Sequence, residues 1–307
     1  MIGRFANWPN ADWRDRVRLL GPASRAHLRT LLILGRASNL PTVWSNCLAG
    51  WFLGGGGSFW GLLLLCFGAT CLYTGGMYLN DAFDEEFDRQ HRPERPIPSR
   101  AVNPAEVWAL GVGWIILGMA VLTFFGSVTA FLSVLLVASI LVYDAVHKVF
   151  MFSPVLMAVC RFFLFLLASS AAVNGVAGLA IWTAFALACY IVGLSYVAKS
   201  ESTRGALKYW PCYLLAAPLF LAYLVNQGDY RSRSVMLSAV VLIWVIRSLY
   251  FTFWSREKNV GRTVSGLLAG IVLIDLLALA GGSPLITLVM LILFVSALLF
   301  QKFIPAT

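Results

Sequence analysis

Apolar runs long enough to cross a bilayer recur along almost the whole chain of 307 residues. A transmembrane helix needs about 20 consecutive, mostly apolar residues. Hydrophobic residues make up 60% of the chain and charged residues only 12%, a composition unlike that of a soluble domain. The runs therefore predict an all-α polytopic membrane protein, a helical bundle with nine to ten transmembrane helices.

The expected organisation is one transmembrane domain, residues 30–307, preceded by an N-terminal segment, residues 1–29. The N-terminal segment is rich in arginine and contains two tryptophans, so it is expected to be a basic amphipathic segment on the membrane surface or a disordered tail. The expected spans are residues 30–53, 59–80, 105–125, 128–145, 153–173, 178–198, 209–226, 234–254, 263–281 and 284–303.

The 23 lysines and arginines give the chain a net charge of +9. In a soluble protein such a charge suggests a nucleic-acid partner, but here most basic residues fall in loops on one side of the expected bundle. This bias predicts a cytoplasmic N-terminus and cytoplasmic polar loops, in the inner membrane if the protein is bacterial, and no nucleic-acid partner. The six cysteines lie in expected spans without a C-x-x-C pair, which predicts no disulfide framework.

An acidic cluster interrupts the apolar pattern at the end of the second span. Asn80, Asp81, Asp84 and Asp88 follow one another at steps of one, three and four residues, so on an α-helix they share one face. Carboxylates beside lipid are costly and repel one another, and a divalent cation removes both penalties. Oxygen ligands of this kind suit Mg²⁺. The cluster predicts a Mg²⁺ site; the alternative is a helix end with solvated charges.

The loop that follows the acids is rich in arginine and proline. Its arginines are Arg89, Arg92, Arg95 and Arg100. Guanidinium groups match phosphate oxygens bidentately, so acids that hold a metal beside arginines that hold phosphate predict a site for a lipid diphosphate.

The acids and the arginine loop together resemble the first aspartate-rich motif of the UbiA superfamily of intramembrane prenyltransferases. The resemblance lies in Asn80-Asp81-x-x-Asp84-x-x-x-Asp88, followed by Arg92-Pro93-x-Arg95-Pro96-Ile97-Pro98-Ser99. It implies Mg²⁺-dependent ionisation of an isoprenyl diphosphate. Arg100 stands where the family often has glycine.

Polar residues in two further regions are expected to join this site. Arg36 and Asn46 give the first span more polarity than lipid contact allows, and the resemblance implies that Arg36 contacts substrate and Asn46 lines the pocket. The alternative for Arg36 is snorkelling to the interface. The segment from Tyr143 to Lys148 resembles the family's Tyr-x(4)-Lys segment, which implies that Lys148 binds diphosphate and Tyr143 lines the pocket.

Three more side chains have expectations that rest on their positions. Asp144 is expected to be a ligand or the partner of Lys148, and His147 is expected at the surface. Arg161 lies two turns inside the fifth span, so it is a functional-site residue by default, with snorkelling as the alternative.

The second polar site departs from the family. Most relatives carry Asp-x-x-x-Asp after the sixth span, but this chain has no aspartate from Lys199 to Gly205. Glu201 is the acid that remains for one metal position, and Lys199 and Arg204 are expected to neutralise diphosphate directly. The departure implies a one-metal site, a different diphosphate substrate or lost transferase activity.

These residues predict an enzyme in which Mg²⁺ and basic groups ionise an isoprenyl diphosphate in a central cavity open to lipid, and an aromatic or lipid acceptor takes the prenyl group. The expected catalytic residues are Asn80, Asp81, Asp84, Asp88, Lys148 and Glu201, with the metal on Asp81, Asp84, Asp88 and Glu201. The expected substrate-binding residues are Arg36, Asn46, Arg92, Tyr143, Arg161, Tyr196 and Lys199. Aromatic faces, at Tyr73, Tyr143 and Tyr196, are expected to stabilise an allylic cation. Two alternatives stay open: a terpene cyclase of the same fold, and a membrane carrier or scaffold that binds lipid phosphate without chemistry.

Overall fold

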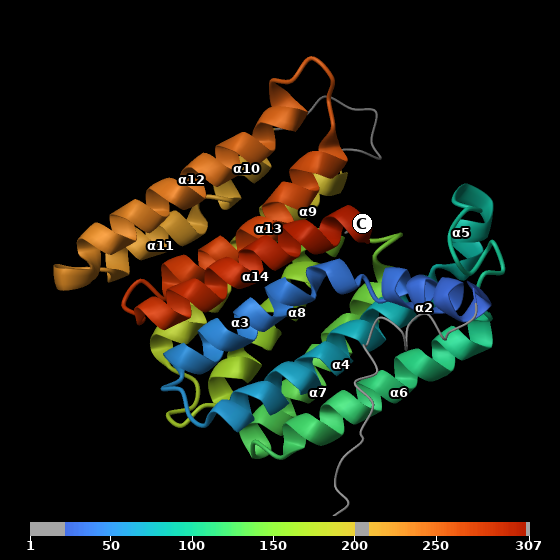
Figure 1. Ribbon diagram of the computed structural model, residues 1–307, viewed down its shortest axis with the longest axis horizontal. Coiled ribbons are helices and arrows are strands. Elements are labelled where there is room, and N and C mark those ends of the chain that lie inside the picture. Colours follow the sequence, from blue (N-terminus) through green and yellow to red (C-terminus); the bar gives the residue numbers. More distant parts are fainter. Residues whose placement is uncertain (1–21, 200–208, 305–307) are drawn as a thin grey trace, which may run out of the picture.

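The computed structural model describes residues 22–199 and 209–304, and within them every regular element is a helix (Figure 1). The α-helices are α2 (Pro22–Leu34), α3 (Leu40–Leu53), α4 (Phe59–Phe83), α5 (Glu85–His91), α6 (Pro104–Thr123), α7 (Ser127–Val146), α8 (Ser153–Ser170), α9 (Gly178–Lys199), α10 (Trp210–Leu214), α11 (Ala217–Val225), α12 (Arg231–Phe253), α13 (Val260–Ala278) and α14 (Pro284–Phe303). Two short 3-10 helices are η1 (Ala37–Asn39) and η2 (Gly228–Tyr230).

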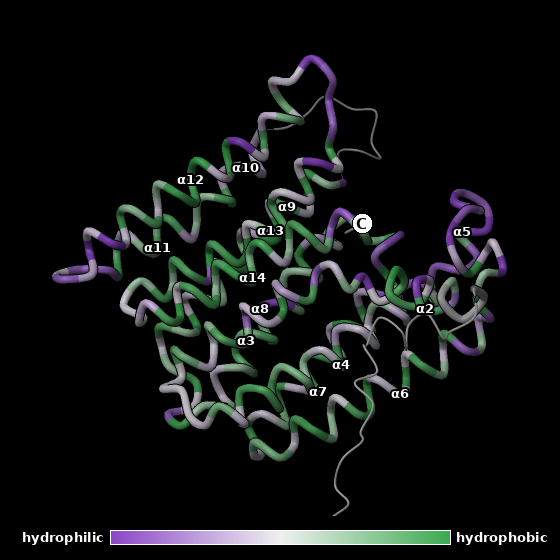
Figure 2. Tube along the Cα trace, viewed as in Figure 1, coloured by the Kyte–Doolittle hydropathy of each residue, from purple (hydrophilic) through white to green (hydrophobic). Residues whose placement is uncertain are grey.

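Eight helical segments of the described chain have the length and apolarity needed to cross a membrane. They are α4, α6, α7, α8, α9, α12 with η2, α13 and α14. Figure 2 shows hydrophobic residues along these helices and hydrophilic residues gathered at α5 and in connecting loops. The expected fold class, an all-α polytopic membrane bundle, is confirmed.

The first and seventh expected spans are broken helices. The first is divided into α2, η1 and α3 because Arg36 adopts a left-handed backbone conformation, with φ 42° and ψ 48°. The seventh is divided into α10 and α11, where the ring of Pro218 is incompatible with a continuous helix through the carbonyl of Leu214. Of the expected N-terminal segment, residues 1–21 lie outside the described residues, and α2 begins at Pro22.

The helix α3 lies at the centre of the bundle, in contact with α4, α8, α13 and α14 (Figure 1). On one side of it α4 packs against α6 and α7, and on the other side α9 packs against α8, α10, α11 and α13. The short α5 projects beyond the ends of α4 and α6. This arrangement places the polar C-terminal end of α4 at one end of the bundle.

Glycines at seven-residue intervals allow α4 and α6 to pack with their backbones close together. A Cβ atom at Gly75 would lie 2.8 Å from the carbonyl oxygen of Gly111, and one at Gly118 would lie 2.9 Å from that of Gly68. Small residues are what such close helix pairs in membranes require. The contact fixes the position of the helix whose end carries the acids.

A small second core holds the arginine-rich loop over the end of α4. Its buried members are Leu34, Tyr78, Ala82, Ile97, Val102 and Val107. The Tyr78 hydroxyl donates to the carbonyl oxygen of Leu31 at 3.1 Å, and Nε2 of His27 lies 3.0 Å from Oε1 of Glu106. These contacts tie α2 and the loop after α5 to α4 and α6.

Replacing Arg100 with glycine is expected to raise the free energy of unfolding by about 0.5–1 kcal/mol. Arg100 has φ 60° and an exposed side chain, so glycine removes strain without removing a buried contact. Thermal unfolding in detergent measures the change. The matched control is Arg92→Gly, at an exposed position with φ −144°, which is expected to lose stability. An equal loss in both variants would contradict the assignment of strain to Arg100.

Candidate active site

The acids at the end of α4 share one face, as their spacing predicts, although α4 ends before the last of them. The backbone N–H of Asp84 donates to the carbonyl oxygen of Asn80 at 3.0 Å, and that of Asp88 donates to Asp84 at 2.8 Å. The helical register therefore continues from α4 into α5. Asn80, Asp81, Asp84 and Asp88 are all buried, Asp88 to 1% exposure.

Arg95 reaches three of these carboxylates from the loop after α5. Its Nη1 lies 2.8 Å from Oδ2 of Asp88, 3.3 Å from Oδ1 of Asp81 and 3.9 Å from Oδ2 of Asp84. The side chain of Arg92, the arginine expected to hold diphosphate, is exposed. Its backbone N–H donates to the backbone carbonyl oxygen of Asp88 at 2.8 Å. Both arginines belong to the same motif, and the path of the proline-rich loop decides which of them faces the acids.

Arg36, between α2 and η1, also reaches the acid face. Its Nη2 donates to Oδ1 of Asn80 at 3.3 Å and lies 3.7 Å from Oδ1 of Asp81. The left-handed backbone at Arg36 separates α2 from η1, at the point where the side chain turns toward these groups. Strain of this kind persists where the surrounding structure determines it, and it is concentrated at functional sites.

The loop between α7 and α8 supplies two further nitrogen groups to Asp84. Oδ2 of Asp84 lies 3.0 Å from Nζ of Lys148 and 3.4 Å from Nε2 of His147. Burial by itself would raise the pKa of Asp84, but the bonds from His147 and Lys148 outweigh it and hold that pKa below its ordinary value. His147, expected at the surface, is instead mostly buried beside Asp84, and Asp144 accepts from Nδ2 of Asn80 at 3.0 Å rather than pairing with Lys148.

The donor set fits a divalent metal, although it is not preassembled. Among residues 22–199 and 209–304, no group of three or more His, Cys, Asp or Glu side chains is already arranged around a metal position. Basic groups neutralise the carboxylates instead. Within the same residues, Oδ1 of Asp88 and Oδ2 of Asp144 are buried without a hydrogen-bond partner. Buried carboxylate oxygens left in this way are the hard ligands that Mg²⁺ prefers.

A cavity of about 360 Å³ extends from this polar face into the bundle. Its polar end includes Arg36, Asp144, His147 and Lys199. Its wall continues with Tyr73, Tyr143, Cys160 and Arg161 and then with the apolar side chains of Leu72, Leu136, Ile140, Leu164, Ile191, Leu194, Leu268 and Ile271. The cavity therefore joins a charged mouth to an apolar interior, the shape that an amphiphile with an anionic head needs.

The other expected site residues take different places. Lys199 lines the mouth, where its Nζ lies 3.4 Å from the carbonyl oxygen of Met151, while Glu201 lies outside the described residues. Tyr196 packs edge-on against the ring of Trp210, with 4.8 Å between centroids, and does not belong to the described cavity wall. Asn46 is fully buried behind that wall.

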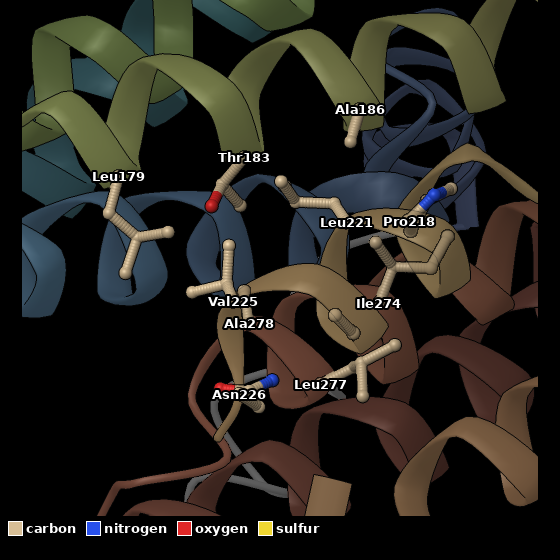
Figure 3. A pocket seen from close by; sticks show the side chains of 11 residues that line it. Leu179, Thr183, Ala186, Pro218, Leu221, Val225, Asn226, Ile274, Leu277 and Ala278 are labelled. Atoms are coloured by element: carbon tan, nitrogen blue, oxygen red, sulfur yellow. The ribbon is translucent and has the colours of Figure 1, made fainter. Parts of the chain in front are cut away.

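A second cavity, between α9, α11 and α13, is far smaller at about 30 Å³ (Figure 3). Leu179, Leu221, Val225, Ile274 and Leu277 line it, with Thr183 and Asn226 as its polar members. Nδ2 of Asn226 donates to Oγ of Ser234 at 2.9 Å. This cavity holds no more than one or two water molecules.

Comparison with known families agrees with the geometry of the larger cavity. The sequence model of the UbiA prenyltransferase family matches residues 40–305. The chain belongs to the UbiA prenyltransferase family. The match includes every α-helix from α3 onward, and so the entire wall of the cavity except Arg36 and Asn39.

Similar proteins within the family include digeranylgeranylglyceryl phosphate synthases of archaea. That of Methanopyrus kandleri is 36% identical over 95 residues, which cover 30% of this chain and 35% of the synthase. That of Methanoregula boonei is 32% identical over 99 residues, which cover 32% of this chain and 35% of the synthase. The matched segment thus spans about a third of each relative's length.

Two solved structures share the fold. The apo structure of a UbiA homolog from Aeropyrum pernix K1 gives a TM-score of 0.64 at 16% identity, over 81% of this chain and 98% of that one. A structure from work on digeranylgeranylglyceryl phosphate synthase in membranes gives a TM-score of 0.57 at 20% identity, over 88% and 98%. At these identities the likeness extends to the fold alone.

Proposed function

We propose that this UbiA-family chain is a Mg²⁺-dependent intramembrane prenyltransferase. It ionises an isoprenyl diphosphate and transfers the prenyl group to a lipid or aromatic acceptor. The observation that carries the proposal is that four basic side chains contact one acid face, and that two of them, Arg36 and His147, also line the polar end of a mostly apolar cavity. The basic side chains are Arg36, Arg95, His147 and Lys148.

The acids and the basic groups have complementary tasks in this reaction. Asp81, Asp84 and Asp88, with Asn80, would hold Mg²⁺, and Glu201 is the proposed ligand from the altered second motif. A bound Mg²⁺ supplies electrostatic stabilisation of the charge that develops on the leaving diphosphate. The basic groups that neutralise the carboxylates would then be available to phosphate oxygens. Lys199, which lines the mouth, would add positive charge there, with the exposed Arg92 as a further candidate from the loop.

The cavity wall accounts for the prenyl group. Apolar side chains exclude water from the allylic cation that forms when the carbon–oxygen bond to diphosphate breaks. The rings of Tyr73 and Tyr143 line the cavity and would stabilise a cation through their π faces. Tyr143 stacks on His147 with 4.9 Å between ring centroids, which holds its ring at the mouth.

The charge distribution supports a cytoplasmic orientation for the site. Arg36, the arginine-rich loop and Lys148 gather at the polar end of the bundle, and basic residues are enriched in cytoplasmic loops of membrane proteins. A water-soluble diphosphate head group would reach the acids from that side, while the acceptor would enter from the membrane.

The decisive experiment measures diphosphate release by the purified full-length protein from C10, C15 and C20 prenyl diphosphates, with and without an added lipid or aromatic extract. Release that depends on the extract is expected and supports a transferase. Release without any acceptor, with a cyclic hydrocarbon or alcohol as product, would instead identify a terpene cyclase. Binding of the prenyl diphosphate without release under any condition would leave the carrier or scaffold.

Removal of divalent metal is expected to reduce diphosphate release at least about 100-fold, because the four buried polar groups of the acid face would lose the metal ion that they are proposed to share. The measurement compares release in EDTA with release after Mg²⁺ is restored. Undiminished release in EDTA would contradict the metal-dependent mechanism. Full recovery with Mg²⁺ shows that the protein remained folded.

A further inference from the structure

A second polar cluster lies inside the bundle where α3, α8 and α13 meet, apart from the acid face (Figure 1). We call it the intramembrane cluster, and its members are Thr42, Ser45, Asn46, Arg161 and Asp275. Three of them come from α3, one from α8 and one from α13. None of the five belongs to the acid face or contacts it directly in the described chain.

Arg161 is held in one orientation by this cluster. Its Nη1 donates to Oδ1 of Asn46 at 2.8 Å and to the carbonyl oxygen of Thr42 at 3.2 Å, and its Nη2 donates to Oγ1 of Thr42 at 2.9 Å. Nδ2 of the same Asn46 side chain donates to Oδ2 of Asp275 at 2.7 Å. Ser45 donates to the same carboxylate oxygen at 2.5 Å. An amide thus connects the guanidinium to its nearest carboxylate.

The two charged ends of the cluster have different surroundings. Asp275, Asn46 and Ser45 are buried among helices, with no more than 1% exposure. Arg161 forms part of the cavity wall, 6.0 Å from the ring of Tyr73. A guanidinium carries five N–H donors, and the described chain supplies acceptors for three bonds at Arg161. Donors therefore remain for a molecule in the cavity.

The depth of Arg161 separates it from the diphosphate mouth. It lies eight residues beyond Ser153, the first residue of α8, which corresponds to about 12 Å along the helix axis. A cation at this depth raises the energy of an allylic cation nearby, and it does so more strongly in an apolar cavity than in water. The carboxylate of Asp275 reaches the guanidinium only through the Asn46 amide, so a negative or strongly accepting group on the cavity side of Arg161 would offset the positive charge that faces the prenyl cation.

We propose that Arg161 binds an anionic oxygen group, a carboxylate or a phosphate, of the prenyl acceptor. Thr42 and Asn46 orient the guanidinium, and Asp275 moderates its attraction for the anion. This inference rests on the proposed function, because it names the chemical class of that enzyme's acceptor.

The test measures binding of small aromatic probes to the full-length protein in nanodiscs by calorimetry. The probes are 4-hydroxybenzoate, phenyl phosphate and the neutral 4-hydroxybenzamide. The unmodified protein is expected to bind at least one of the two anions about tenfold or more tightly than the neutral amide. The anion with the higher affinity shows whether the site prefers a carboxylate or a phosphate. Arg161→Gln is expected to abolish the preference, and Arg161→Lys to retain part of it. The matched control is Arg247→Gln, an exposed arginine over the Trp244 ring on α12, which is expected to leave it unchanged.

Asp275→Asn distinguishes a binding role from a purely structural one. Asparagine keeps an oxygen that accepts from Ser45 and Asn46 but removes the negative charge behind Arg161. Anion affinity is expected to rise threefold or more if Arg161 binds the anion. An unchanged affinity in this variant, or an anion preference that survives in Arg161→Gln, would overturn the inference and leave the cluster as a bond between helices.

A parallel measurement of diphosphate release distinguishes failure of this inference from failure of the proposed function. Mg²⁺-dependent release from a prenyl diphosphate is measured on the same preparations. Release by the unmodified protein without any anion preference would refute the role of Arg161 and leave the proposed transferase standing. An anion preference without release from any prenyl diphosphate would refute the enzyme, and with it the assignment of the anion to an acceptor.

Discussion

Replacing Asp84 with alanine is expected to reduce Mg²⁺-dependent diphosphate release at least about 1,000-fold. Asp84 lies beside the cavity mouth, since His147 lines the cavity and contacts Oδ2 of Asp84, which Lys148 contacts as well. Its loss removes a proposed metal ligand. It also leaves Lys148 without the carboxylate that now positions its ammonium group.

The low pKa of Asp84 strengthens this expectation. The carboxylate stays charged in the physiological range because His147 and Lys148 stabilise its anionic form against the effect of burial. A neutral side chain therefore changes the net charge of the site. Asp84→Asn keeps the size and polarity of the side chain but not the charge, so it is expected to lose nearly as much activity as Asp84→Ala.

The matched control is Glu86→Ala, two residues after Asp84 in the first turn of α5. Glu86 is an exposed acid whose partners are Arg89 and Gln90 on the surface of α5. Its removal is expected to change release less than threefold. Equal losses of activity in the two variants would show that activity depends on the total negative charge near α5, and would contradict the specific role assigned to Asp84. Thermal unfolding of each variant reports whether the fold is retained.

Helical periodicity explains why the acid face could be predicted from sequence. The steps between the four polar residues return to one face only if the chain stays helical, and the backbone bonds across Asp84 preserve that register where α4 ends. The membrane spans were predictable for a similar reason, because length and apolarity are local properties of the chain. Both features depend on residues that are close together in the sequence.

Contacts between residues far apart in the sequence could not be predicted from local sequence patterns. Arg95 rather than Arg92 meets the acids because of how the proline-rich loop packs on the small core around Ile97. Nothing in the spacing of Asn46, Arg161 and Asp275 indicates that three helices bring them together, and Asn46 and Asp275 are separated by 229 positions. The two broken spans were missed because apolar composition hides a backbone turn at Arg36 and a proline break before Pro218.

Replacing Gly75 with valine is expected to lower the free energy of unfolding by about 3 kcal/mol. A Cβ atom there would lie 2.8 Å from the carbonyl oxygen of Gly111 and 3.0 Å from the backbone nitrogen of Ile115. Backbone atoms cannot rotate away as the end of a flexible side chain can. Relief therefore requires α4 and α6 to separate, and the whole α4–α6 contact loses packing.

The same change is expected to reach the acid face, because α4 carries Asn80 and Asp81 about one and a half turns beyond Gly75. A displacement of about 1 Å at a reacting centre costs about 100-fold in rate, so activity is expected to fall by that order even in protein that remains folded. The matched control is Gly113→Val on α6, where an added Cβ meets nothing within 4 Å. Valine there is expected to face lipid without loss of activity. Detergent unfolding and diphosphate release on both variants separate the two positions, and equal behaviour would refute a packing role for Gly75.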